Sequence, residues 1–327
     1  MSQSRVGILG LGAYMPERVL TNADLEKIVD TSDEWIQTRT GIKERRIADK
    51  GTPTSELAAR AAEGALKQAG LKATDLDLII LATISPDMVF PSTACIVQNK
   101  IGAQCAAFDI SAACSGFPYA LTLAEGLIRS GSYKYILVIG AEVISTYINW
   151  KDRSTCVLFG DGAGAAVLGK TDDGSGILST YLGSDGSQAK LLQIPAGGSA
   201  IPTTPESVSQ GLHFVQMEGS EVFKSAVRTM GDSVIEVTKR AGLKVEDIDC
   251  LIPHQANLRI LNAVTDRIGI DPKKVFINLD RYGNMSAAST AVALFEAVQE
   301  GRIKKGSIVV LVAFGSGLTW AACTIQW

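Results

Sequence analysis

The chain has 327 residues, of which 46% are hydrophobic and 20% charged, and its formal net charge at pH 7 is −3. This length exceeds what one hydrophobic core usually holds, so two domains or one large duplicated domain are expected. The slightly acidic balance argues against a general nucleic-acid binder, and the absence of a run of about 18 apolar residues argues against a membrane span.

Short apolar runs alternate along the chain with Ala-rich stretches that have helical periodicity. Runs of Val, Ile and Leu without polar alternation predict strands that are covered on both faces. The predicted strands are Leu76–Thr83, Ala106–Ile110, Tyr135–Gly140, Asp249–Pro253 and Ile308–Phe314, and the predicted helices are Ser55–Ala69, Pro118–Ser130, Ser220–Ala241 and Ala287–Glu300. The alternation predicts an α/β layered fold. The Gly-, Ser- and Pro-rich segment 184–210 predicts a long surface excursion.

Segments of the first half recur in the second half at a nearly constant offset. AGLKATDLDLII at 69–80 matches AGLKVEDIDCLI at 241–252, SAACSGF at 111–117 is echoed by SAASTAV at 286–292, and EGLIRSGSYKYILVIG at 125–140 matches EGRIKKGSIVVLVAFG at 300–315. A period this long predicts two similar packed halves, 1–172 and 173–327, rather than a solenoid. The echo pairs Cys114 with Ser289, so the halves keep one scaffold and differ at this position.

Cys114 lies in DISAACSGFPYAL, where an apolar strand runs into small residues and then into a helix. N–H groups at the helix N-terminus would stabilise a thiolate there, and ligands bind at the carboxyl ends of strands in such folds. A buried structural cysteine is the competing interpretation, and the local pattern leaves both open. For the other cysteines a structural role is favoured. None forms a C-x-x-C pair, and the start of the chain has no secretion signal, so a reduced, cytoplasmic protein is expected.

Two polar residues of the second half also follow or precede predicted core elements. His254 in LIPHQAN follows a strand, and Asn284 in DRYGNMSAAS precedes the helix that mirrors the Cys114 helix. A lone histidine is more often structural, and an asparagine in such a turn can be a simple cap. The mirror relation favours a cleft that both share with Cys114. His213, in an apolar stretch, is interpreted as structural, and with only two histidines no metal site is expected.

Three glycine-rich segments, 7–14, 159–168 and 313–320, flank apolar strands. None is a phosphate loop, and the first lacks the third glycine of a dinucleotide fingerprint. Close backbone packing is the favoured explanation for 159–168. For 313–320 the repeat places Gly315 opposite Gly140 at a strand end, where a backbone N–H could hold an oxyanion.

Together these motifs resemble the β-ketoacyl-acyl carrier protein synthase III family, the initiating condensing enzymes of dissociated fatty-acid synthesis. The resemblance covers essentially the whole chain and is carried by TSDEWIQTRTGIKERR, ISAACSGF, GDGAGAAVL, PHQAN, YGNMSAAS and AFGSGLTW. It implies a thiolase-like five-layer α-β-α-β-α fold, a homodimer, and chemistry without a metal or redox cofactor.

The resemblance also implies a mechanism. The Cys114 thiolate would take the acyl group of a short acyl-CoA. His254 and Asn284 would hydrogen-bond the thioester oxygen of malonyl-acyl carrier protein as CO2 leaves, and the carbanion would attack the acyl-cysteine. The backbone N–H groups of Cys114 and Ser316 would hold the oxyanion. The product would be a 3-oxoacyl-acyl carrier protein, which initiates fatty-acid synthesis.

Binding roles follow from the same resemblance. It implies that the contacts for CoA or its pantetheine arm are Trp35, Arg39, Arg153, Phe223 and Asn257 and that the basic patch for the acidic carrier protein is Lys224, Arg259 and Arg267. Phe90 would reach the acyl pocket of the partner subunit. Three positions depart from the family pattern: Ser316 where glycine is frequent, Glu218 where asparagine is expected, and Asp266 where a second cation can occur.

Several alternatives use similar residues. A type III polyketide synthase has the same fold, and the short chain and the PHQANLR motif count against it. Asn284 disfavours a two-histidine condensing enzyme, and the motif around Cys323 disfavours a thiolase. A cysteine hydrolase and a catalytically silent acyl-binding protein are more distant alternatives. Dependence on the carrier protein separates them, and the length of the starter acyl chain stays open.

Overall fold

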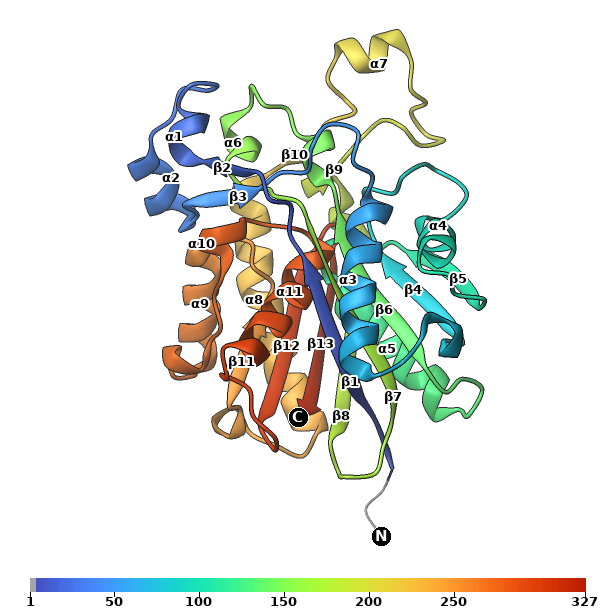
Figure 1. Cartoon of the computed structure of the whole chain (residues 1–327). Coiled ribbons are helices and arrows are strands. Elements are labelled where there is room, and N and C mark those ends of the chain that lie inside the picture. Colours follow the sequence, from blue (N-terminus) through green and yellow to red (C-terminus); the bar gives the residue numbers. More distant parts are fainter. Residues whose placement is uncertain (1–3) are drawn as a thin grey trace.

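The computed structural model describes residues 4–327 and contains two large sheets with helices outside and between them (Figure 1). The first sheet has the order β1-β7-β6-β4-β5 and the second the order β11-β12-β13-β8. Their strands are β1 (Arg5–Tyr14), β4 (Leu78–Ala82), β5 (Ala106–Ile110), β6 (Ile136–Glu142), β7 (Gly162–Thr171), β8 (Gly176–Ser184), β11 (Cys250–Pro253), β12 (Ile308–Gly315) and β13 (Thr319–Gln326). The neighbouring strands β4–β5, β4–β6 and β11–β12 are parallel to each other, and their carboxyl ends lie at the site.

Helices complete the five layers. The long helices are α3 (Thr54–Ala69), α4 (Thr93–Lys100), α5 (Gly116–Arg129), α8 (Gly219–Arg240), α9 (Leu258–Ile268) and α11 (Ala287–Gln299). α3 and α4 cover the outer face of the first sheet, α8 and α9 cover the outer face of the second, and α5 and α11 lie between the sheets. The thiolase-like five-layer arrangement expected from the sequence is thereby confirmed. The predicted strands and helices are also confirmed, with ends that move by about one or two residues.

Shorter elements surround the end of the sheets at which the site lies. They are β2 (Val19–Thr21), α1 (Asn22–Leu25), α2 (Asp33–Thr40), β3 (Glu44–Arg46), α6 (Arg153–Cys156), β9 (Leu192–Gln193), α7 (Pro205–Ser209), β10 (Gln216–Met217) and α10 (Leu279–Tyr282). The segment 184–210 is a surface excursion, as predicted, and α7 stands away from the sheets in Figure 1. Within the described residues, no helix combines the length and the apolar character that a membrane crossing requires.

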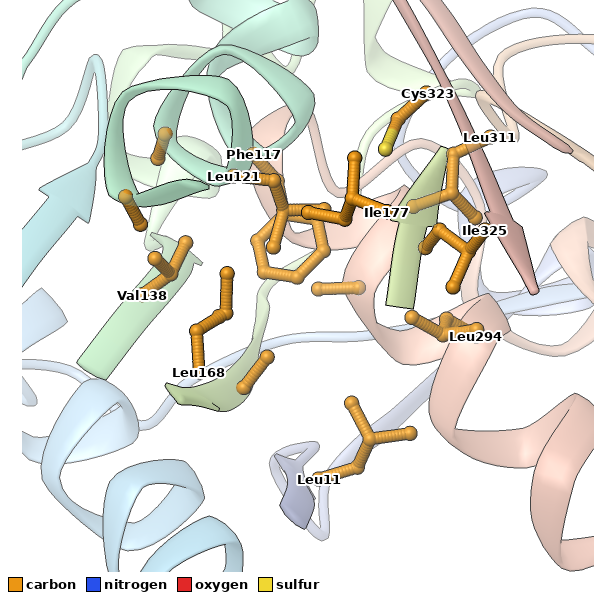
Figure 2. Packing of buried hydrophobic residues seen from close by; sticks show 14 of the residues in the cluster. Leu11, Phe117, Leu121, Val138, Leu168, Ile177, Leu294, Leu311, Cys323 and Ile325 are labelled. Carbon is orange, nitrogen blue, oxygen red and sulfur yellow. The ribbon is translucent and has the colours of Figure 1, made fainter. Parts of the chain in front are cut away.

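The layer between the sheets is a closely packed apolar core (Figure 2). Phe117 and Leu121 of α5 and Leu294 of α11 are fully buried there, against strand residues of both sheets such as Val138. A core packed at this density allows little movement of its helices. The N-termini of α5 and α11, which carry the residues of the site, are therefore held in fixed positions.

The glycines of β1 allow close packing of this strand against a helix. A Cβ atom on Gly12 would lie 2.1 Å from the carbonyl oxygen of Ala61, and one on Gly10 would lie 2.4 Å from that of Ala65. Both alanines belong to α3, so the strand and the helix backbone touch at a distance that only glycine permits. The close backbone packing considered for this segment in the sequence is thus present.

The two halves meet at a pair of matching turns. Ala113 and Ser286 both have a φ of 47°, an uncommon value for a residue other than glycine. A Cβ atom on Gly315 would lie 2.6 Å from the Cys114 nitrogen, and one on Gly140 would lie 2.4 Å from the Ala287 carbonyl oxygen. Since Gly140 and Gly315 are equivalent in the repeat, the counterpart of Cys114 is Ala287.

The predicted pairing of Cys114 with Ser289 is therefore wrong by two positions. Both segments are rich in Ala and Ser, so a shift between them costs little sequence similarity, whereas the backbone turns fix the register. All strands of the first sheet lie within 5–171 and all strands of the second within 176–326. The boundary between residues 172 and 173 stays a prediction.

Candidate active site

Cys114 lies at a sharp turn between β5 and α5, in a 3₁₀ turn that spans Ala113–Ser115. The turn is tied to the second half of the chain, because the Ser115 and Thr319 hydroxyls are 2.6 Å apart and both contact the Ala112 carbonyl oxygen. Cys114 is only 6% exposed and lines two cavities that meet at its side chain. The turn therefore presents this one thiol to both cavities.

The Cys114 thiol is protonated in the free protein at neutral pH. Burial raises its pKa to about 12, and the Ser286 hydroxyl offsets only part of that rise. The sequence suggested that a helix N-terminus would favour the thiolate. In the folded chain burial is the larger effect, so the reactive thiolate must form during the reaction.

His254 follows β11 directly, and its backbone N–H donates to the Val312 carbonyl oxygen over 2.7 Å. The side chain is 3% exposed, and burial lowers the imidazole pKa to about 3. Among the residues that the structure describes, Nδ1 has no hydrogen-bond partner. The ring is therefore neutral over the physiological pH range and can donate through its protonated nitrogen.

Asn284 is held by hydrogen bonds on three sides. Its N–H donates to the Leu158 carbonyl oxygen over 2.8 Å, and its carbonyl oxygen accepts from the Gly160 N–H over 3.0 Å. Its side-chain Oδ1 accepts from the Ser286 N–H over 2.8 Å. Because Oδ1 is used in this way, the NH2 group of the amide is left as the donor on the other side.

The first cavity has a volume of about 650 Å³ and connects Cys114, His254 and Asn284 with the protein surface. The structure thus brings together the three residues that were predicted from different parts of the sequence. Trp35, Arg39, Phe223, Lys224, Asn257 and Arg259 line the same cavity nearer its mouth. The cavity is a tunnel-like space built by α2, α8 and α9 that ends at the thiol.

Arg153 lies beside this mouth rather than among its lining residues. Its guanidinium stands 4.7 Å from the centre of the Trp35 ring, and it donates to the Asp30 carbonyl oxygen over 2.8 Å. Asn257 caps α9 with its side chain and donates to the Arg39 carbonyl oxygen over 3.1 Å. The residues expected to contact CoA therefore form one connected group at the surface.

The cations of the expected carrier-protein patch differ in their surroundings. Arg267 pairs with Asp232 at 2.8 Å, Lys224 pairs with Glu221 at 2.7 Å, and Arg259 lies over the Phe223 ring at 5.8 Å. Arg267 is not among the residues that line the cavity. The two carboxylates reduce the net positive charge of the patch.

A second cavity of about 370 Å³ lies on the other side of Cys114 and is largely apolar. Its apolar lining consists of Ile84, Ile144, Phe159, Leu192, Ile194 and Val215. None of these residues was predicted from the sequence, because they come from separate loops that only the fold brings together. The short apolar run around Leu192 inside the polar excursion was the one available signal.

Ser316 directly follows the end of β12 beside Cys114 and contacts the wall between the two cavities. Its hydroxyl donates to the carbonyl oxygen of Leu192, a residue that lines both cavities. The serine that departs from the family pattern thus has a structural partner. Across from it, the close approach of Gly315 to the Cys114 nitrogen excludes any side chain at position 315.

Phe90 does not reach either cavity of its own chain. It lies in the loop between β4 and α4 and is 83% exposed, next to Val89 at 87%.

Across residues 4–327, no group of three or more His, Cys, Asp or Glu side chains is arranged to hold a metal ion.

Comparison with known proteins identifies the family. Residues 108–186 match the family model of 3-oxoacyl-[acyl-carrier-protein (ACP)] synthase III, and residues 238–327 match the model of its C-terminal part. A β-ketoacyl-[acyl-carrier-protein] synthase III of Caldanaerobacter subterraneus is 61% identical over 98% of this chain and 97% of its own. The chain belongs to the β-ketoacyl-[acyl-carrier-protein] synthase III family.

Solved structures agree with this assignment. The 3-oxoacyl-[acyl-carrier-protein] synthase III of Aquifex aeolicus is 50% identical and has a TM-score of 0.91, covering 98% of this chain and 100% of its own. The priming β-ketosynthase of the R1128 polyketide pathway has the same TM-score, 0.91, at 34% identity, covering 100% of this chain and 98% of its own. Family membership makes the chain a condensing enzyme of the acyltransferase type.

Proposed function

We propose that this enzyme condenses a short acyl-CoA with malonyl-acyl carrier protein to give a 3-oxoacyl-acyl carrier protein and CO2, the initiating step of fatty-acid synthesis. The observation that carries the proposal is the meeting of two cavities at one buried thiol. One cavity leads from the surface to Cys114, His254 and Asn284, and an apolar cavity continues beyond the thiol. This arrangement suits a thioester whose long arm fills the first cavity and whose acyl chain fills the second.

In the first half-reaction Cys114 attacks the thioester carbonyl of the acyl-CoA. The Cys114–acyl bond forms, the bond between the carbonyl carbon and the CoA sulfur breaks, and CoA leaves as its thiolate. The backbone N–H groups of Cys114 and Ser316 hold the oxyanion that forms during attack. Trp35 stacks on the adenine, and Arg39, Arg153, Phe223 and Asn257 hold the remainder of CoA.

In the second half-reaction malonyl-acyl carrier protein occupies the same tunnel and loses CO2. The neutral His254 and the amide of Asn284 donate hydrogen bonds to the thioester oxygen, which becomes negative as the enolate forms. The enolate carbon attacks the acyl-Cys114 carbonyl, and the Cys114 sulfur departs. The β-carboxylate supplies the driving force, so the reaction needs no metal or redox cofactor.

The carrier protein docks beside the tunnel mouth. Lys224, Arg259 and Arg267 supply positive charge for an acidic partner. The pairing of two of them with carboxylates predicts an attraction that is moderate and sensitive to salt. The six free cysteines support a reducing compartment, the cytoplasm, as the location of the enzyme, and fractionation of cells that produce it would check this.

The experiment that tests this function follows the mass of the intact protein. With a panel of short acyl-CoAs, the wild type should gain one acyl group, and malonyl-acyl carrier protein should discharge it as a 3-oxoacyl-acyl carrier protein. A chelator should change neither step. Discharge by water alone would indicate a hydrolase, and discharge by malonyl-CoA in place of the carrier protein would indicate the polyketide-type alternative. The acyl-CoA that reacts fastest identifies the starter.

We also propose that the enzyme is a homodimer whose interface includes β5 and the loop that carries Phe90. β5 is an edge strand, Phe108 on it is 39% exposed, and Val89 and Phe90 are nearly fully exposed. Unpaired strand edges and contiguous apolar side chains favour association with a second copy. In the dimer Phe90 reaches the acyl cavity of the partner subunit.

The molar mass in solution tests the dimer. Light scattering should give about twice the 34.6 kDa of one chain. Phe108→Glu should shift the molecule towards the monomer because it places a charge in the buried interface. Ile235→Glu, on the exposed face of α8, is the matched control and should leave the mass unchanged. A wild type that runs as a monomer at micromolar concentration would contradict the proposal.

A further inference from the structure

A buried carboxyl group lies behind the nucleophile and has no part in the chemistry described so far. Glu142 ends β6 and is 0% exposed. Its Oε2 accepts hydrogen bonds from the Ser85 hydroxyl over 2.5 Å, the Ser85 N–H over 3.1 Å and the Thr83 hydroxyl over 3.1 Å. The Ile84 N–H is within 3.3 Å of both oxygens, and the Ala287 N–H at the start of α11 approaches Oε1 at 3.4 Å.

The hydroxyl groups around Oε2 are fixed as donors. The Ser85 hydroxyl oxygen accepts from the Val143 N–H over 2.9 Å, and the Thr83 hydroxyl oxygen accepts from the Ser85 N–H over 3.1 Å. The hydrogen atoms of both hydroxyls therefore point to the carboxylate. This shell favours the ionised form, whereas burial favours the neutral acid. Burial is the larger effect and raises the Glu142 pKa to about 7.

Ser286, at the start of α11, is a neighbour of both this carboxyl group and the thiol. It is 0% exposed, it lines the apolar cavity together with Cys114, and its hydroxyl makes no hydrogen bond of ordinary geometry within the described part of the chain. The hydroxyl is nonetheless near enough to Cys114 and Glu142 to lower the pKa of both groups. A buried hydroxyl without a fixed partner can accept from one neighbour and donate to the other.

The first half-reaction needs a base for the thiol proton. The pKa of Cys114 is about 12, so very little thiolate exists near neutral pH. His254 is a poor acceptor because burial lowers its pKa to about 3. Glu142 has a pKa of about 7, which is the range in which a general base works best at neutral pH.

We propose that Ser286 and Glu142 form a proton relay that takes the thiol proton of Cys114 during acylation and returns it after condensation. As the Cys114 sulfur attacks the acyl-CoA, its proton passes to the Ser286 oxygen, and the Ser286 hydroxyl proton passes to Oε1 of Glu142. CoA leaves as a thiolate, so charge is conserved. When condensation expels the Cys114 thiolate, the proton moves back from Glu142 through Ser286. The inference rests on the proposed condensation, and it makes Ser286 a catalytic residue and Glu142 a positioning residue that acts through it.

Other ionisable groups near the relay do not replace it. Burial, and to a smaller extent the charge of Glu142, raises the pKa of Tyr147 above its usual value. Its hydroxyl group therefore stays neutral. Asp161 directly precedes β7. Burial raises the pKa of its carboxyl group, and its oxygens already accept hydrogen bonds from Ala48 and Ser145. Neither side chain is hydrogen-bonded to Glu142. The proposed path for the proton therefore runs from the thiol through the Ser286 hydroxyl to Glu142.

Single-turnover release of CoA, measured against pH, tests the relay. In the wild type the acylation rate should rise with pH through about 7, because the ionised Glu142 is the base. Glu142→Gln and Ser286→Ala should lose this rise and acylate about 100-fold more slowly at neutral pH. Ser286→Ala is compatible with the backbone, since Ala113 has the same φ of 47°. Glu142→Asp should restore part of the rate together with the pH-dependent rise.

Glu296→Gln is the matched control. Glu296 is a second buried glutamate, located on α11, and it accepts hydrogen bonds from Asn278 and Tyr282. It should leave the acylation profile unchanged. The rate at which malonyl-acyl carrier protein is decarboxylated should differ by less than about threefold between Cys114→Ala and Cys114→Ala/Glu142→Gln. This result would show that the fold and the second half-reaction survive the loss of the Glu142 carboxylate.

Alkylation of the thiol by iodoacetamide separates the relay from simple repulsion. Besides burial, the charge of Glu142 raises the Cys114 pKa. If repulsion were its only effect, Glu142→Gln would alkylate faster at neutral pH, and that result would overturn the proposal. Equal acylation rates and pH profiles in the wild type and both variants would overturn it as well. Failure of the wild type to acylate with any acyl-CoA would instead refute the proposed function.

Discussion

Cys114→Ala should form no acyl adduct with any acyl-CoA and should lose condensation by at least about 1,000-fold. The sulfur is the atom that carries the acyl group between the two substrates. Among the described residues that line both cavities, Cys114 alone has a nucleophilic side chain. The substitution removes only one sulfur from a site that is already nearly closed to solvent, so the fold should be retained. Intact mass after addition of acyl-CoA measures the adduct, and release of CO2 from malonyl-acyl carrier protein measures the remaining activity.

Cys105→Ser is the control for this prediction. Cys105 is partly exposed and lies outside both cavities, and burial raises the pKa of its thiol. It should acylate like the wild type. An adduct of normal stoichiometry on Cys114→Ala would show that another residue is the nucleophile, and the assignment of both cavities would then have to change.

His254→Ala and Asn284→Ala should keep the first half-reaction and lose the second. We expect the acyl adduct to form at a rate within about tenfold of the wild type, whereas condensation falls by about 100- to 1,000-fold for each variant. The physical reason is that both side chains are donors to an oxygen that becomes negative only as CO2 leaves. The two measurements are the acylation burst and the rate of 14C-labelled CO2 release.

The pH dependence of these steps follows from the charge of His254. A lowered pKa of about 3 keeps its imidazole neutral at all pH values at which the enzyme is stable, so it should contribute no inflection to condensation near neutral pH. His213→Ala is the matched control, since that ring stacks on Phe214 and lines neither cavity. Equal losses of acylation and condensation in His254→Ala would indicate a role in activating Cys114 instead.

The local features of the site were readable from the residues themselves. The strand–turn–helix pattern around Cys114 and the apolar run before His254 are local in sequence, and the structure has them within a residue or two. The duplication was also visible, because both halves keep the same helix, loop and strand in the same order. The register of the repeat at the nucleophile was not visible in the sequence, because runs of Ala and Ser align equally well at several offsets.

Burial explains why the ionisation of the site could not be predicted. The helix N-terminus near Cys114 suggested a thiolate, but the pKa of a thiol depends on how much solvent the whole fold removes from it. The same applies to Glu142, for which the sequence predicts no role. Nothing in VIGAEVIS marks a functional carboxyl group, because its partners come from the loop after β4 and from α11.

The sequence by itself determined the layered α/β architecture and the duplication, because these depend on periodicity and local turns. It also named Cys114, His254 and Asn284 as candidates, through the resemblance of their motifs to a known family. The tertiary structure alone decided which groups are charged, which side chains line the acyl cavity, and that Ser286 and Glu142 stand behind Cys114. These properties arise from contacts between the two halves, where burial and proximity are set by packing and not by distance along the chain.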